Sequence, residues 1–173
     1  MTFQLSALAP YTDRAGRLSV VKLVAFVACC APAAWMAYQW GAGLLSPKPA
    51  TDILRQTGDW SIRFLVATLA VSPLRHATRW NRIYLIRRML GLTALAYTLA
   101  HLGFWFAHEN FVWSRILSES VLRVYLVVGY AALFIMVALG VTSNEASIRR
   151  LGAARWNALH WWVYPAALAS LVH

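Results

Sequence analysis

The chain alternates between long apolar stretches and shorter polar connections rich in arginine. Apolar runs cover about 18–40, 58–73, 84–106, 121–141 and 156–173. Each approaches the roughly 20 residues that an α-helix needs to cross the hydrocarbon core of a bilayer. The run at 58–73 is the weakest, because it carries Arg63 and ends at Ser72-Pro73. The pattern predicts an all-α integral membrane bundle of about five transmembrane helices, forming a single domain over 1–173.

Composition agrees with this class, since 60% of the residues are hydrophobic and only 13% are charged. This balance is typical of membrane proteins and excludes a soluble domain of this size. The first apolar run is too long for a signal-peptide core and lacks a small-residue cleavage site, so we expect a membrane helix there. Its adjacent Cys29 and Cys30 would form a strained disulfide, and we interpret both as packing residues.

Basic residues concentrate in alternate connections, which predicts the orientation of the bundle. The segments 1–22, 74–88 and 142–155 carry most of the lysines and arginines, including Arg14 and Arg17. The positive-inside rule therefore places the N terminus in the cytoplasm. Contacts with anionic lipid head groups explain the net charge of +10, and we expect no nucleic-acid binding.

Three histidines lie within or at the ends of these apolar runs, where ionisable side chains are costly and usually functional. They are His101, in LTALAYTLAHLGFWFA, and His160 and His173, in NALHWWVYPAALASLVH. The helices at 84–106 and 156–173 are parallel in this topology, so the helical rise allows their depths to be compared. His101 and His173 lie roughly 20 and 27 Å from the cytoplasmic edge, and His160 roughly 8 Å. Because His160 and His173 are roughly 20 Å apart, two metal levels fit better than one.

Paired histidines at one depth suggest a redox role. Two neutral imidazoles from facing helices give a six-coordinate heme iron suited to electron transfer. The alternative is a non-redox transporter or structural subunit, in which the same histidines form hydrogen bonds between helices. For His76, in the arginine-rich connection, and His108, at a helix end, we expect interfacial or solvated roles. The sequence contains no nucleotide-binding glycine pattern, zinc pattern or Ser-His-acid set, so we expect an electron-transfer subunit rather than a complete enzyme.

Three segments together resemble a known family: ATDILRQTGDWSIRFLVATLAVSPLR, IRRMLGLTALAYTLAH and TSNEASIRRLGAARWNALHWWVYPAALASLVH. They are similar to the heme-binding membrane subunits of periplasmic methionine sulfoxide reductase systems, in the ferric reductase-like transmembrane group. The resemblance covers most of the chain from about residue 50. Its anchors are TGDW, SPLR, RRMLGL, His101 and the RLGAARWNALH…H pair.

The resemblance implies that His101, His160 and His173 are axial ligands of one or two b-type hemes. Electrons would pass to a separate periplasmic molybdopterin subunit, which reduces methionine sulfoxide in oxidised proteins. It also implies a bacterial inner-membrane location, electron supply from the quinone pool or a cytosolic flavin reductase, and a bound FMN. Other members of the group reduce ferric or cupric ions at the periplasmic face, which is the second redox alternative.

The chain departs from the family pattern in two places. Related oxidases carry two histidines on each ligand helix, whereas Arg87 stands fourteen residues before His101 and shares its helical face. Arg87 either pairs with heme propionates or extends to lipid phosphates. Family members have six helices, while this sequence ends at His173 within the predicted fifth. In an ideal helix His160 and His173 face roughly 140° apart, and a kink at Pro165 is our hypothesis for turning both inward.

Aromatic and glycine residues add smaller expectations. Most of the tryptophans lie near predicted helix ends, as in membrane-interface belts, and Trp161 and Trp162 flank His160, where they would wall a heme. Gly91, Gly129 and Gly140 allow close approach of another helix or of a flat macrocycle.

Overall fold

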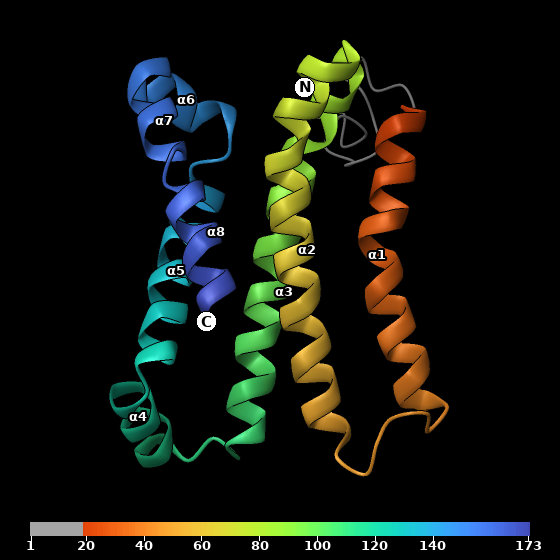
Figure 1. Ribbon diagram of the computed structural model, residues 1–173, viewed down its shortest axis with the longest axis vertical. Coiled ribbons are helices and arrows are strands. Elements are labelled where there is room, and N and C mark those ends of the chain that lie inside the picture. The colour runs from red at the N-terminus through yellow and green to blue at the C-terminus, as the bar shows by residue number, and fades with distance from the viewer. Residues whose placement is uncertain (1–18) are drawn as a thin grey trace, which may run out of the picture.

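The computed structural model describes residues 19–173, and within that range all regular structure is helical (Figure 1). This confirms the predicted all-α class. Arg14 and Arg17, which contribute to the predicted orientation, lie outside the described residues. The elements are α1 (Val20–Gly41), α2 (Pro49–Thr78), the 3-10 helix η2 (Asn81–Ile86), α3 (Arg87–His108), α4 (Trp113–Leu122), α5 (Val124–Val141), α6 (Glu145–Leu151), α7 (Ala153–His160) and α8 (Val163–Val172).

Three of the described helical stretches are long and apolar enough to cross a membrane: Val20–Gly41, Ile83–His108 and Val124–Val141. They confirm three of the five predicted spans. Large apolar side chains point outward from them, as Phe134 on α5 does with 72% of its surface exposed. An outer surface of this kind is expected where lipid, rather than water, surrounds a bundle.

Helix α2 is longer and more polar than the predicted span at 58–73. It begins with Pro49 at its first turn, continues through Pro73 and ends at Thr78, so the end expected at Ser72-Pro73 was wrong. An internal proline removes one hydrogen bond, and the flanking turns still hold the helix here. At about 45 Å, α2 exceeds the thickness of a hydrocarbon core. The Arg63 guanidinium lies 4.7 Å from the centre of the Trp60 ring, which explains how a charge fits in this segment.

The predicted fifth span at 156–173 is two helices rather than one. Helix α7 ends at His160, α8 begins at Val163, and Trp161 and Trp162 form the turn between them. Pro165 explains this position, because a proline ring clashes with the carbonyl four residues earlier, here that of Trp161. The helix is thus interrupted just before the turn that contains Pro165, whereas the inward turning of both His160 and His173 stays a hypothesis.

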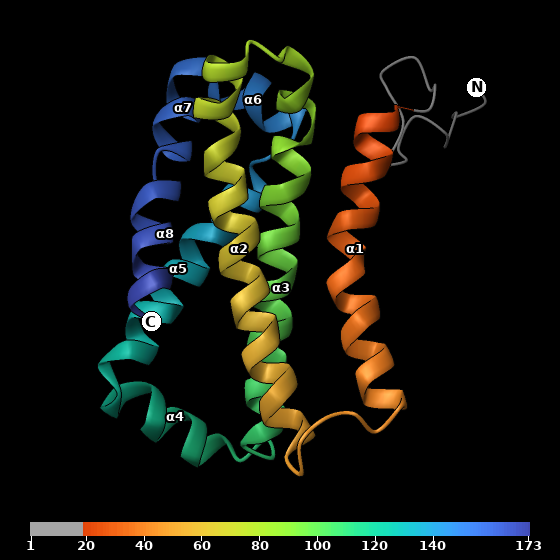
Figure 2. The ribbon, with the colours of Figure 1, turned by 45° about the vertical axis from the view of Figure 1, so that its right-hand side comes forward.

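Helices α2 and α3 pack side by side, α5 packs against α8 and α3, and α1 stands at the edge of the bundle (Figures 1 and 2). Ser61 of α2 donates to the carbonyl of Ala94 on α3 at 3.2 Å. Tyr97 donates its hydroxyl proton to the carbonyl of Cys29 on α1 at 3.1 Å. Cys29 is buried and Cys30 exposed, and both thiols are free, which confirms the packing role for Cys29.

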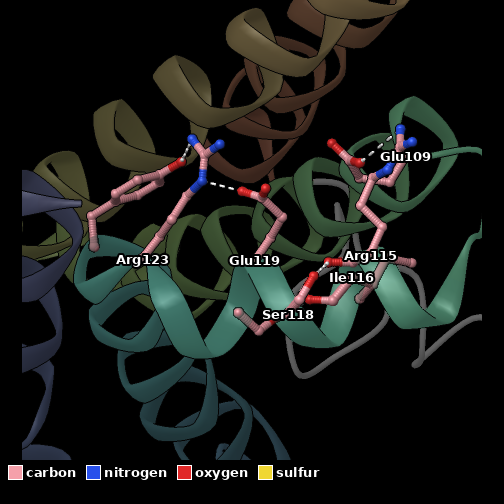
Figure 3. A network of polar contacts seen from close by, with 8 residues as sticks. Glu109, Arg115, Ile116, Ser118, Glu119 and Arg123 are labelled. Atoms are coloured by element: carbon pink, nitrogen blue, oxygen red, sulfur yellow. Dashed lines mark hydrogen bonds and ion pairs between the residues drawn. The ribbon is translucent and has the colours of Figure 1, made fainter.

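Helix α4 is held to the start of α5 by a polar network (Figure 3). The Arg123 guanidinium pairs with the Glu119 carboxylate and donates to the Tyr125 hydroxyl at 3.1 Å. On the bundle side Ile116 is buried. These contacts fix the first turn of α5, whose Tyr125 carbonyl belongs to the site described next.

Removing the Tyr97 hydroxyl should loosen α1. In Tyr97→Phe the carbonyl of Cys29 loses the hydrogen bond from the Tyr97 hydroxyl. We therefore expect the free energy of unfolding to fall by about 1 kcal/mol. Denaturant titration in detergent micelles measures this change, with the exposed Tyr38→Phe as the control. An unchanged midpoint would show that this hydrogen bond does not stabilise the bundle.

Candidate metal centre

His101 and His173 lie next to each other in the bundle. Their ring centroids are 6.2 Å apart and the ring planes are inclined by 87°. His101 belongs to the middle of α3, whereas His173 directly follows α8. The structure thus brings together the two histidines that the depth comparison pairs. Because each metal–imidazole bond is about 2 Å long, two rings on opposite sides of one metal have centres about 6 Å apart. The observed separation fits this arrangement.

A backbone carbonyl on the neighbouring helix orients the His101 ring. The Nδ1 atom lies 2.9 Å from the carbonyl oxygen of Leu54 on α2. A carbonyl oxygen can only accept, so Nδ1 must carry the proton and Nε2 keeps its lone pair. This is the neutral tautomer that binds metals, and metal-bound histidines commonly make such a bond through their other nitrogen.

His173 is oriented in the same way from the other side. Its Nδ1 atom lies 2.7 Å from the carbonyl oxygen of Tyr125 on α5. Its own backbone N–H donates to the carbonyl of Ala169 at 3.0 Å and extends the last turn of α8. Two hydrogen bonds therefore fix a residue at the helix end, and in the neutral ring this geometry leaves the lone pair on Nε2.

His160 lies at the end of α7, away from the His101–His173 pair along the chain. Its ring stacks on Trp156 at a centroid distance of 3.8 Å, and its Nδ1 lies 3.1 Å from the Trp156 carbonyl one turn earlier. The Trp156 indole in turn donates to the carbonyl of Thr142 at 2.9 Å. Arg87, at the start of α3, lies within electrostatic range of the His160 ring. Arg87 therefore belongs with the His160 level and not with the His101–His173 pair.

Other residues singled out in the sequence lie away from both sites or at their edges. His76 and His108 are exposed, as expected for solvated or interfacial positions. Trp161 and Trp162 are 70% and 55% exposed and, with Pro165, line an open apolar hollow on the surface.

Two backbone groups at this site were not identified from the sequence. The carbonyls of Leu54 and Tyr125 orient the histidine pair, and a backbone carbonyl is present at every position regardless of residue type. The nearby glycines are the only trace in the sequence, and Gly58 falls inside the TGDW segment.

The chain is similar to known proteins over most of its length. The model of the ferric reductase like transmembrane component matches residues 56–171. The chain is 40% identical, over 93% of its length and 76% of the relative, to the protein-methionine-sulfoxide reductase heme-binding subunit MsrQ of Rhodospirillum rubrum. It is 36% identical to MsrQ of Herminiimonas arsenicoxydans, over 91% of this chain and 72% of the relative. This chain belongs to the MsrQ family. No solved structure matches it.

Membership of the MsrQ family agrees with the membrane bundle described above, because the chain also matches the ferric reductase like transmembrane component. The segment matched by the ferric reductase-like model contains His101 and His160 and ends two residues before His173. The relatives with this name are called heme-binding subunits. The neighbouring imidazoles of His101 and His173 are a donor set that would suit a heme iron.

Proposed function

We propose that this chain is a heme b electron-transfer subunit, built as one transmembrane domain, in a bacterial inner-membrane methionine sulfoxide reductase system. The observation that carries the proposal is the His101–His173 pair. The rings are 6.2 Å apart, and each donates its Nδ1 proton to a backbone carbonyl. His101 and His173 would hold a heme, and that heme would supply one-electron transfer.

The residues of this chain have three tasks in this function. His101 and His173 would hold a heme iron through Nε2. The Leu54 carbonyl orients the His101 ring, and the Tyr125 carbonyl orients the His173 ring, for this role. For His160 we propose a second heme near the cytoplasmic side, with Arg87 pairing with its propionates.

The sulfoxide chemistry belongs to a partner subunit. Reduction of a sulfoxide to a thioether consumes two electrons and two protons and releases water. A subunit that passes single electrons must therefore serve a centre that collects two. The relatives' name, a heme-binding subunit of a methionine sulfoxide reductase, supports such a division of tasks. We propose that the partner is a periplasmic molybdopterin protein that repairs oxidised proteins.

The electron donor is proposed to be the quinone pool or a cytosolic flavin reductase, with FMN as an additional cofactor. The predicted orientation puts His160 and Arg87 toward the cytoplasmic side, where a cytosolic flavin reductase would deliver electrons. Reduction of the purified heme by a quinol analogue, compared with reduction by a flavin reductase and NADPH, identifies the donor. Fluorescence of the acid-released flavin shows whether FMN is bound.

Ferric or cupric reduction is a second candidate, favoured by the matching ferric reductase-like family. A deletion strain separates the two functions. Accumulation of methionine sulfoxide in periplasmic proteins, with normal metal reduction, supports the main proposal, whereas the opposite result supports metal reduction.

Visible spectroscopy tests the heme itself. Purified wild-type protein should show a b-type reduced-minus-oxidised spectrum and a positive pyridine hemochrome assay. A folded, colourless protein from cells supplied with heme would instead favour the non-redox alternative, in which His101 and His173 only connect helices through hydrogen bonds.

A further inference from the structure

The two paired histidines are bound to their neighbouring helices in the same way. His101 contacts the carbonyl of Leu54, and Gly58 follows four residues later on α2. His173 contacts the carbonyl of Tyr125, and Gly129 follows four residues later on α5. We call each carbonyl with its following glycine, Leu54 with Gly58 and Tyr125 with Gly129, a carbonyl seat.

The spacing has a physical reason. In an α-helix the carbonyl of residue i accepts from the amide of residue i+4, and the Cβ of residue i+4 tilts back toward the helix N terminus. A side chain at i+4 therefore crowds the open side of that carbonyl. Glycine leaves this side accessible, so the carbonyl can accept a second hydrogen bond from an imidazole on another helix.

The imidazole rings fill the space of the missing side chains. A Cβ atom at Gly58 would lie 3.0 Å from Nδ1 and 3.1 Å from Cε1 of His101. A Cβ atom at Gly129 would lie 2.5 Å from both Nδ1 and Cε1 of His173. The first contact requires a small shift of the ring, and the second requires its displacement.

The His101 seat contains one further donor. The buried Thr57 hydroxyl lies 2.8 Å from the Leu54 carbonyl oxygen and 2.9 Å from that of Ile53. The Leu54 carbonyl oxygen thus accepts hydrogen bonds from both the Thr57 hydroxyl and the His101 ring. A carbonyl oxygen that already accepts a hydrogen bond from another donor is a weaker acceptor. The hydrogen bond from the His101 Nδ1–H to the Leu54 carbonyl is therefore weaker when the Thr57 hydroxyl is present.

We propose that Gly58 and Gly129 are positioning residues that open the two carbonyl seats for the axial histidines, and that Thr57 tunes the reduction potential through the His101 seat. This rests on the proposed heme at His101 and His173. A stronger hydrogen bond from Nδ1–H to the carbonyl makes the imidazole a better electron donor to a bound iron. This would favour ferric over ferrous iron. The proposal thereby assigns roles to Thr57 and Gly58, the first two residues of the TGDW segment.

Glycine substitutions test the seats. We expect Gly129→Ala to lose most of its heme, about tenfold, and Gly58→Ala to keep heme with an altered low-spin EPR signal and potential. Gly103→Ala is the matched control, because it lies on α3 two residues after His101 and a Cβ there meets nothing within 4 Å. If wild type binds heme and all three variants match it in heme content, EPR signal and potential, the proposal is overturned.

Substitutions of Thr57 test the tuning. Thr57→Val keeps the shape and removes the hydroxyl, so we expect a lower midpoint potential by redox titration, with unchanged heme content. Thr57→Ser keeps the hydroxyl and should retain the wild-type potential. A Thr57→Val potential equal to or above that of wild type would refute this part of the proposal.

Failure of the proposed function is distinguishable from failure of the seats. If wild type binds no heme, ¹⁵N NMR of histidine-labelled protein still reports the tautomers. The seats then predict protonated Nδ1 at His173 in wild type and in Gly103→Ala, and loss of this state in Gly129→Ala. Equal histidine spectra in all three proteins would reject the seats independently of heme.

Discussion

His101→Ala is expected to abolish heme binding at the His101–His173 level, with a loss of about tenfold or more at that level. Alanine provides no axial nitrogen, and the remaining His173 would hold the iron from one side only. Pyridine hemochrome per milligram of purified protein measures the loss. The reduced-minus-oxidised spectrum shows which component disappears.

His108→Ala is the control for this prediction, because His108 lies on the same helix and is exposed. It should keep the full heme content. His173→Ala provides an independent check, since it should remove the same spectral component as His101→Ala from a different helix. Full heme content in both His101→Ala and His173→Ala would show that these rings only connect α3 to α2 and α8 to α5.

The pairing of His101 with His173 was predictable because it depends only on helix direction and rise. Both α3 and α8 run away from the end of the bundle that holds η2 and α6 (Figure 1). Residues at similar distances from that end must then lie at similar depths. Charge and hydrophobicity patterns sufficed for this, since they determine where helices begin and which way they run.

The local features of the site were not predictable from the same patterns. The carbonyls of Leu54 and Tyr125 are present whatever the residue type, and the glycine four residues after each one points to it only once packing has placed a histidine there. The same limit applies to the helix ends. Pro73 lies in the interior of α2, whereas Pro165 lies in the first turn of α8, just after a break. Whether a helix continues through a proline depends on its packing. The free-energy cost of the lost hydrogen bond and the ring clash can be smaller than the stabilisation that contacts with neighbouring helices supply.

His160→Ala is expected to lower the heme content by about half and to leave the low-spin signal of the His101–His173 heme unchanged. The two levels lie roughly 20 Å apart along the chain, so loss of one should not disturb the other. His76→Ala, at an exposed histidine, serves as the control. Heme quantification together with EPR of the oxidised protein distinguishes the two levels.

The contacts of His160 define the competing outcome. Its ring stacks on Trp156, bonds to the Trp156 carbonyl and interacts with the Leu139 backbone, and these contacts suit a structural histidine. In that case His160→Ala keeps all heme and only lowers the free energy of unfolding, by about 1 kcal/mol. Arg87→Gln further distinguishes a heme-binding His160 from a structural one. If Arg87 pairs with propionates at this level, its loss should reduce the same heme component as His160→Ala, whereas the adjacent Arg88→Gln should not.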